Sequence, residues 1–151
     1  MLSYRHGFHA GNHADVLKHT ALVALLRILA RKDKPLLVVD THAGAGMYSL
    51  EQGFAVRNAE FRGGIGALWE RSDLPESVTD YLDQVRAVNP DGVLRQYPGS
   101  PRIALRVLRP QDRLRLFELH STEGPILAQQ FAQDSRRVTV TAGRSQNARA
   151  R

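Results

Sequence analysis

The chain has 151 residues, of which 42% are hydrophobic, and carries a formal net charge of +6 with no cysteine. This length supports one domain with its own core, no apolar run reaches the roughly 20 residues of a transmembrane helix, and the absence of cysteine excludes disulfides and thiolate metal sites. The N-terminus lacks the apolar core of a signal peptide, so we expect a soluble cytoplasmic protein, and the positive charge is consistent with a polyanionic partner or with solubility alone.

The N-terminal stretch HGFHAGNHADVLKH holds four of the six histidines, His6, His9, His13 and His19. His9 and His13 have the spacing of a helical zinc pair. However, Gly11 and Asn12 between them predict a turn before the helix, and no third ligand is well placed. We therefore predict no metal site.

A long helix and a short strand follow this turn. Asn12 is a suitable cap for a helix from about residue 13 to 31, which ends before Pro35. Residues 36–40, LLVVD, form a short apolar run typical of a strand that is buried on both faces of a parallel sheet. The sequence THAGAG, residues 41–46, then indicates a glycine-containing turn.

The spacing of the strands indicates an insertion. The next strand-like segment, residues 113–119, begins more than seventy residues after Asp40, whereas a doubly wound α/β fold brings in its second strand after roughly 20 residues. The intervening segment contains predicted helices at 65–69 and 75–88. We therefore expect a small helical subdomain, residues 53–96, inserted into an α/β sheet.

The last third of the chain completes the predicted sheet. Ser100 is predicted to cap a helix whose first residue is Pro101, Pro125 to start another helix, and residues 137–141 to form a third strand. The predicted segments are 1–52 with the first helix, strand and glycine turn, 53–96 with the helical subdomain, 97–142 with strands two and three, and 143–151 as a tail.

The glycine turn and a second acid suggest a nucleotide-containing cofactor. Asp40 ends the first strand, and Gly44-x-Gly46 allows a ligand to approach the backbone, although a tight turn with positive φ explains the glycines equally well. Glu118 ends the second strand, where a carboxylate can bind the ribose of NAD or S-adenosylmethionine; its simpler explanation is an exposed acid. NAD is disfavoured because Ser49 stands where the dinucleotide fingerprint has its third glycine.

Four motifs together resemble a known family. MLSYRHGFHAGNHADVLKH, DTHAGAGMY, YPGSP and FELH are similar to the RlmJ family of bacterial 23S ribosomal RNA adenine-N6 methyltransferases, over residues 1 to about 142. The resemblance implies the N-terminal half of a Rossmann-like methyltransferase fold with an inserted helical subdomain. It also implies S-adenosyl-L-methionine as cofactor, 23S ribosomal RNA as partner, a monomeric family, and no membrane or metal partner.

The resemblance also implies roles for individual residues: His19, His42, Ser100 and Glu118 match cofactor-binding positions, and Tyr4 matches a residue that contacts substrate RNA. His19 lies one helical turn beyond Asp15, so we expect the imidazole N–H to donate a hydrogen bond to this carboxylate, which would fix the tautomer. His42 lies in the glycine turn, and the Ser100 hydroxyl serves as a helix cap. A histidine on a helix face or in a loop is otherwise structural or solvated.

Positive charge gathers in two places. Arg5 follows Tyr4, which gives an aromatic ring beside a guanidinium. A basic cluster near the end of the first helix either faces RNA or interacts with the helix dipole. This cluster consists of Arg27, Arg31, Lys32 and Lys34.

Two family features are missing. No Asp-Pro-Pro-Tyr-like segment, which holds the exocyclic amine in adenine-N6 methyltransferases, occurs in the chain, and Gly143 follows Ala142 where the family has Asp-Gly. We hypothesise a frameshift or premature stop after about residue 142. We predict that the chain alone has no catalytic residues and no activity; alternatively, it is a non-catalytic fragment that binds S-adenosylmethionine or RNA weakly. Its half sheet leaves an open apolar edge, which predicts aggregation or pairing with another chain.

Overall fold

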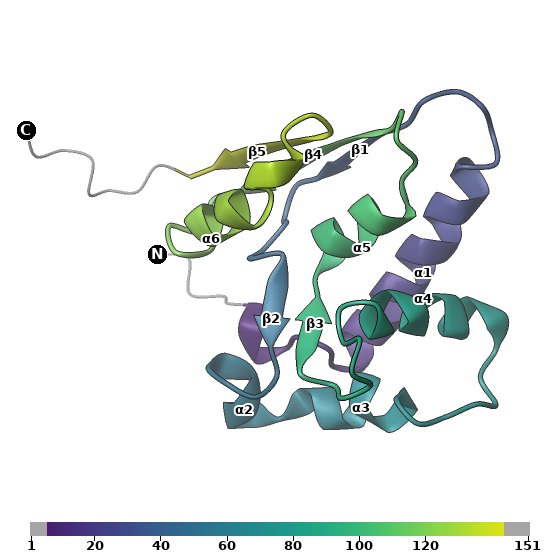
Figure 1. Ribbon diagram of the computed structural model, residues 1–151. Coiled ribbons are helices and arrows are strands. Elements are labelled where there is room, and N and C mark those ends of the chain that lie inside the picture. Colours follow the sequence, from purple (N-terminus) through teal and green to yellow (C-terminus); the bar gives the residue numbers. More distant parts are fainter. Residues whose placement is uncertain (1–5, 144–151) are drawn as a thin grey trace, which may run out of the picture.

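The computed structural model describes residues 6–143, which form a mixed α/β structure (Figure 1). Its main sheet is parallel and has the order β1-β4-β5. Leu37 pairs with Arg113, and Leu114 pairs with Val138. A second, two-stranded sheet is antiparallel and pairs Tyr48 with Tyr97. The strands are β1 (Leu37–Asp40), β2 (Met47–Ser49), β3 (Gln96–Pro98), β4 (Arg113–Glu118) and β5 (Val138–Ala142).

The helices are α1 (His13–Leu29), α2 (Phe54–Asn58), α3 (Ile65–Leu68), α4 (Glu76–Arg86), α5 (Ser100–Val107) and α6 (Glu123–Gln130). Asn12 caps α1 as predicted, since its side-chain oxygen accepts the Asp15 N–H at 3.0 Å. The last helix begins at Glu123, two residues before the predicted start at Pro125, because proline is tolerated throughout a first turn whose N–H groups have no intrahelical partner. None of the helices within residues 6–143 combines the length and the apolar character needed to cross a bilayer.

Helices cover one face of the main sheet. In Figure 1 the strands β1, β4 and β5 run along the top, with α5 and α6 below them. Leu114 and Leu116 of β4 are fully buried in a core that includes Leu127 of α6 and Ala104 of α5. This core fixes the carboxyl ends of β1 and β4 above the N-terminus of α5.

The opposite face of the sheet carries exposed apolar side chains. Leu37 and Val39 of β1 are 56% and 49% exposed, and Phe117 of β4 is 36% exposed. The prediction that the first strand is buried on both faces is therefore wrong. The reason is that β1 is an edge strand and that, within residues 6–143, helices pack against one face only.

A second core joins α1, α4 and the β2–β3 ribbon. Val23 of α1, Tyr81 and Val85 of α4, and Tyr97 of β3 are each fully buried in it. The predicted helices at 65–69 and 75–88 are confirmed as α3 and α4, whereas α2 and the two short strands were not predicted. The ribbon carries the chain from the glycine turn into residues 53–96 and returns it directly to α5.

Candidate functional site

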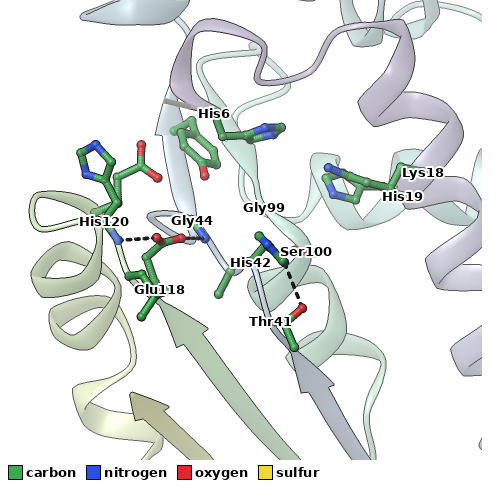
Figure 2. A pocket seen from close by; sticks show the side chains of 14 residues that line it. His6, Lys18, His19, Thr41, His42, Gly44, Gly99, Ser100, Glu118 and His120 are labelled. Atoms are coloured by element: carbon green, nitrogen blue, oxygen red, sulfur yellow. Dashed lines mark hydrogen bonds between the residues drawn. The ribbon is translucent and has the colours of Figure 1, made fainter. Parts of the chain in front are cut away.

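A pocket of about 360 Å³ lies at the carboxyl ends of β1 and β4 (Figure 2). All four residues predicted to bind a cofactor line it: His19, His42, Ser100 and Glu118. They come from α1, the turn after β1, the first residue of α5 and the last residue of β4. In Figure 2, His19 and Lys18 lie on one side of the pocket, and Glu118 and His120 on the other. The fold thus assembles one cavity from positions spread over a hundred residues.

The glycine turn forms one wall and is tied to β4 through Glu118. The Gly44 N–H donates to Glu118 Oε2 at 2.8 Å, and the His120 N–H donates to Oε1 at 2.7 Å. Each carboxylate oxygen therefore retains one lone pair. Gly44 and Gly46 have φ of +63° and +84°, and a Cβ on Gly44 would overlap the Tyr48 hydroxyl. The glycines therefore have the positive φ expected of a tight turn, and this turn also lines the pocket.

Ser100 does not cap α5, which corrects the sequence prediction. Gly99 occupies the cap position, and the Ser100 hydroxyl donates to Asp40 Oδ2 at 2.6 Å. Because Ser100 is already the first helical residue, its side chain reaches the end of β1 instead of the free N–H groups of its own helix. Asp40 Oδ1 accepts the His42 N–H at 3.0 Å. Asp40 itself does not line the pocket, but its carboxylate holds two residues that do, His42 and Ser100.

His19 is held by a tyrosine, so its predicted hydrogen bond to Asp15 is wrong. Its Nδ1 lies 2.7 Å from the Tyr97 hydroxyl. The 3-10 turn at the start of the described chain places His6 Nε2 2.8 Å from Asp15 Oδ2, and Lys18 Nζ lies 2.8 Å from Oδ1. These contacts occupy the carboxylate, while the β2–β3 ribbon brings Tyr97 to the imidazole.

The surroundings of His19 and Asp15 give these two side chains different charge states. Burial lowers the pKa of His19 to about 3, so the imidazole is neutral near pH 7. Burial alone would raise the pKa of Asp15, but its interactions with His6, His19 and Lys18 together outweigh burial and hold that pKa well below its usual value. The pocket lining therefore includes a neutral imidazole and Lys18, and Lys18 is paired with the ionised Asp15 carboxylate, which does not line the pocket.

Two further histidines of the pocket lining, His42 and His120, contact neighbouring residues. His42 Nδ1 is 2.9 Å from Thr41 Oγ1, whereas the buried His120 accepts the Thr122 N–H on Nδ1 at 3.2 Å. His120 ends the FELH motif and lies next to Leu119, which also lines the pocket. Its position in this motif was the signal that could have identified it as a pocket residue. The lining residues other than His19, His42, Ser100 and Glu118 are His6, Lys18, Thr41, Ala43, Gly44, Tyr48, Gly99, Leu119, His120 and Glu123.

The remaining sequence predictions fall elsewhere. Tyr4 and Arg5 lie outside the described residues. In the basic cluster, Arg27 forms an ion pair with Asp80 of α4. His9 Nδ1 lies 2.9 Å from Glu60 Oε2, and residues 6–143 contain no group of three histidine or acidic side chains placed to hold a metal ion.

Comparisons with known proteins agree on one family. A family model described as "Ribosomal RNA large subunit methyltransferase D, RlmJ" matches residues 33–150. The chain is 52% identical over 136 residues to ribosomal RNA large subunit methyltransferase J of Escherichia coli K12, covering 90% of this chain and 49% of that protein. It is 48% identical over 141 residues to the Haemophilus influenzae protein of the same name, covering 93% and 50%.

A solved structure supports the fold. A crystal structure of a protein from Legionella pneumophila str. Philadelphia 1 matches with a TM-score of 0.73 and 44% identity, over 79% of this chain and 43% of that chain. The chain therefore spans about half the length of the curated relatives and of the solved structure that it matches.

Proposed function

Because the chain belongs to the RlmJ family of ribosomal RNA large subunit methyltransferases, we propose that its pocket binds S-adenosyl-L-methionine. One observation carries this proposal: His19, His42, Ser100 and Glu118 line a single cavity at the carboxyl ends of parallel strands, where nucleotide cofactors bind in α/β sheets. The order β5-β4-β1 is that of the first half of a doubly wound sheet, so we assign a Rossmann-like fold with residues 53–96 as its insertion.

The groups in the pocket fit such a cofactor. Each oxygen of Glu118 retains a lone pair for a ribose hydroxyl. The N-terminus of α5, beginning at Ser100, presents N–H groups to a carboxylate. His19 Nε2 is buried and has no hydrogen-bond partner among the described residues. The cavity volume of about 360 Å³ lies within the range of small-molecule sites. When bound, S-adenosylmethionine supplies an electrophilic methyl group.

For the whole protein we propose methyl transfer to N6 of an adenine in 23S ribosomal RNA, in the cytoplasm, with Tyr4 on the RNA. The chain of 151 residues contains no Asp-Pro-Pro-Tyr-like segment. It therefore contributes cofactor binding and no amine-binding strand, and we expect no methyl transfer from it.

Titration calorimetry with S-adenosylmethionine tests the binding proposal. Glu118→Gln should weaken binding at least about tenfold, because glutamine has one acceptor oxygen and cannot serve two backbone N–H groups and two ribose hydroxyls. Glu70→Gln, on an exposed site away from the pocket, is the matched control and should bind like the unmodified chain. No heat above buffer with the unmodified chain, or tighter binding of NAD, would overturn the proposal.

Transfer of tritiated methyl groups to unmodified 23S RNA tests the second part. We expect no incorporation from this chain at any concentration at which it binds the cofactor. Incorporation above a no-protein blank would show that a different segment of these 151 residues holds the adenine.

A further inference from the structure

Three buried side chains form a hydrogen-bonded line that ends at the pocket. The Tyr81 hydroxyl of α4 lies 3.0 Å from the Tyr97 hydroxyl of β3, which lies 2.7 Å from His19 Nδ1. Tyr81 and Tyr97 are 0% exposed and His19 is 1% exposed. The His19 ring lines the pocket, and its Nε2 has no partner among the described residues. The line therefore connects the core below α4 to a cofactor-facing ring.

The number of available acceptors sets the direction of these hydrogen bonds. Tyr97 is the single hydrogen-bond partner of the Tyr81 hydroxyl among residues 6–143. Its proton can therefore go only to the Tyr97 oxygen. Tyr97 then gives its own proton to His19 Nδ1, and the neutral ring carries its hydrogen on Nε2.

The reverse direction leaves more buried groups unsatisfied. If His19 Nδ1 donated to Tyr97 and Tyr97 donated to Tyr81, the Tyr81 proton would have no acceptor and Nε2 would be a second unsatisfied atom. The forward direction leaves one group of these three side chains unsatisfied, the Nε2–H of His19. Because each unsatisfied buried donor carries a desolvation penalty, the forward direction is favoured.

We propose that Tyr81 and Tyr97 act as positioning residues that fix His19 as the Nε2–H tautomer, so that it donates a hydrogen bond to an acceptor atom of the ligand in the pocket. The identity of that ligand as S-adenosylmethionine rests on the function proposed above. Burial keeps the imidazole uncharged, so its donor is selective for oxygen or nitrogen lone pairs without adding a positive charge beside the sulfonium.

The tautomer is measurable in the ligand-free chain by long-range ¹H–¹⁵N correlation spectra of protein labelled with ¹⁵N-histidine. His19→Gln identifies the His19 signals by their loss. We expect the Nε2–H form in the unmodified chain and a mixture of both forms in Tyr97→Phe, which keeps the ring but removes the proton donated to Nδ1. Tyr81→Phe should lie between them. Tyr48→Phe removes another buried phenol hydroxyl outside the line and should leave the tautomer unchanged.

Cofactor affinity gives the second measurement. Tyr97→Phe should weaken S-adenosylmethionine binding about fivefold, as expected for one neutral hydrogen bond. An Nδ1–H tautomer in the unmodified chain, or an unchanged tautomer in Tyr97→Phe, would overturn this inference even if the cofactor binds. The Nε2–H tautomer with the expected Tyr97→Phe change, but without cofactor binding, would support the line of hydrogen bonds and contradict the proposed function. If Tyr97→Phe does not fold, the tautomer of the unmodified chain and Tyr81→Phe decide the outcome.

Discussion

The hydroxyl of Ser100 donates a 2.6 Å hydrogen bond to Asp40, which joins the first residue of α5 to the last residue of β1. The same carboxylate accepts the backbone N–H of His42. One side chain thus sets the distance between two walls of the pocket. The acid at the end of the first strand therefore orders the pocket walls although it does not line the pocket itself.

Removal of the hydroxyl in Ser100→Ala should lower the free energy of unfolding by about 1.5 kcal/mol, the lower end for a hydrogen bond to a charged group, because the bond is partly buried. Urea denaturation measures this change, and S-adenosylmethionine affinity should fall with it. Ser77→Ala, on the exposed surface of α4, is the control and should stay within about 0.5 kcal/mol of the unmodified chain. Equal stability of the two variants would mean that the bond contributes nothing.

Gly44→Ala should destabilise the chain for two separable reasons. Positive φ costs an alanine about 1–2 kcal/mol, and overlap of its Cβ with the Tyr48 hydroxyl adds to this. Gly92→Ala reports the first effect alone, since Gly92 has φ +78° and open space around its Cα. In a Tyr48→Phe background, the cost of Gly44→Ala should approach that of Gly92→Ala. Additive effects in this double-mutant cycle would show that the hydroxyl does not restrict the turn.

Stability should fall as the pH drops from 6.5 toward 3 because of His19. Its pKa is about 3 in the folded chain, so below pH 6.5 the unfolded chain binds a proton that the folded chain does not. The full contribution is present above pH 6.5, and the slope reaches at most about 1.4 kcal/mol per pH unit. Between pH 6.5 and 5 the acids with lowered pKa values, including Asp15 and Asp112, do not contribute, because their protonation begins lower. His19→Gln should remove this slope in denaturation curves, and a slope that persists would assign it to another group.

The chain alone should associate through the exposed face of the main sheet. Val39 is 49% exposed on edge strand β1 beside Leu37, on the face opposite α5 and α6. Val39→Thr should reduce the sedimentation-derived mass at a given concentration without loss of stability, because threonine has the same shape and similar strand propensity. Val93→Thr, at a valine 47% exposed in the loop after α4, is the matched control. A monomer at all concentrations, with a cooperative thermal transition, would contradict this prediction.

Local signals in the sequence located most elements, whereas the four candidate cofactor residues came from the resemblance to a family. Asn12 before an apolar helix, Pro75 before α4 and the alternating strand that ends at Glu118 each act over a few residues, so they can be recognised without the fold. The resemblance to a family then supplied roles that no spacing could supply. The ribbon of β2 and β3 was missed because each strand has three residues, too few for a periodic pattern.

The residue pattern alone was enough to predict an α/β chain with a glycine turn, an acid at the end of each of two strands, and a histidine-rich N-terminus. It could not predict the hydrogen-bond partners of these residues, which depend on how the elements pack. His19 meets Tyr97, 78 positions away, instead of the nearby Asp15, and Ser100 meets Asp40, 60 positions away, instead of its own helix. The physical reason is that a buried polar group bonds to whichever partner the packed elements bring to it, and that partner is set by the sheet order and the β2–β3 ribbon rather than by distance along the chain.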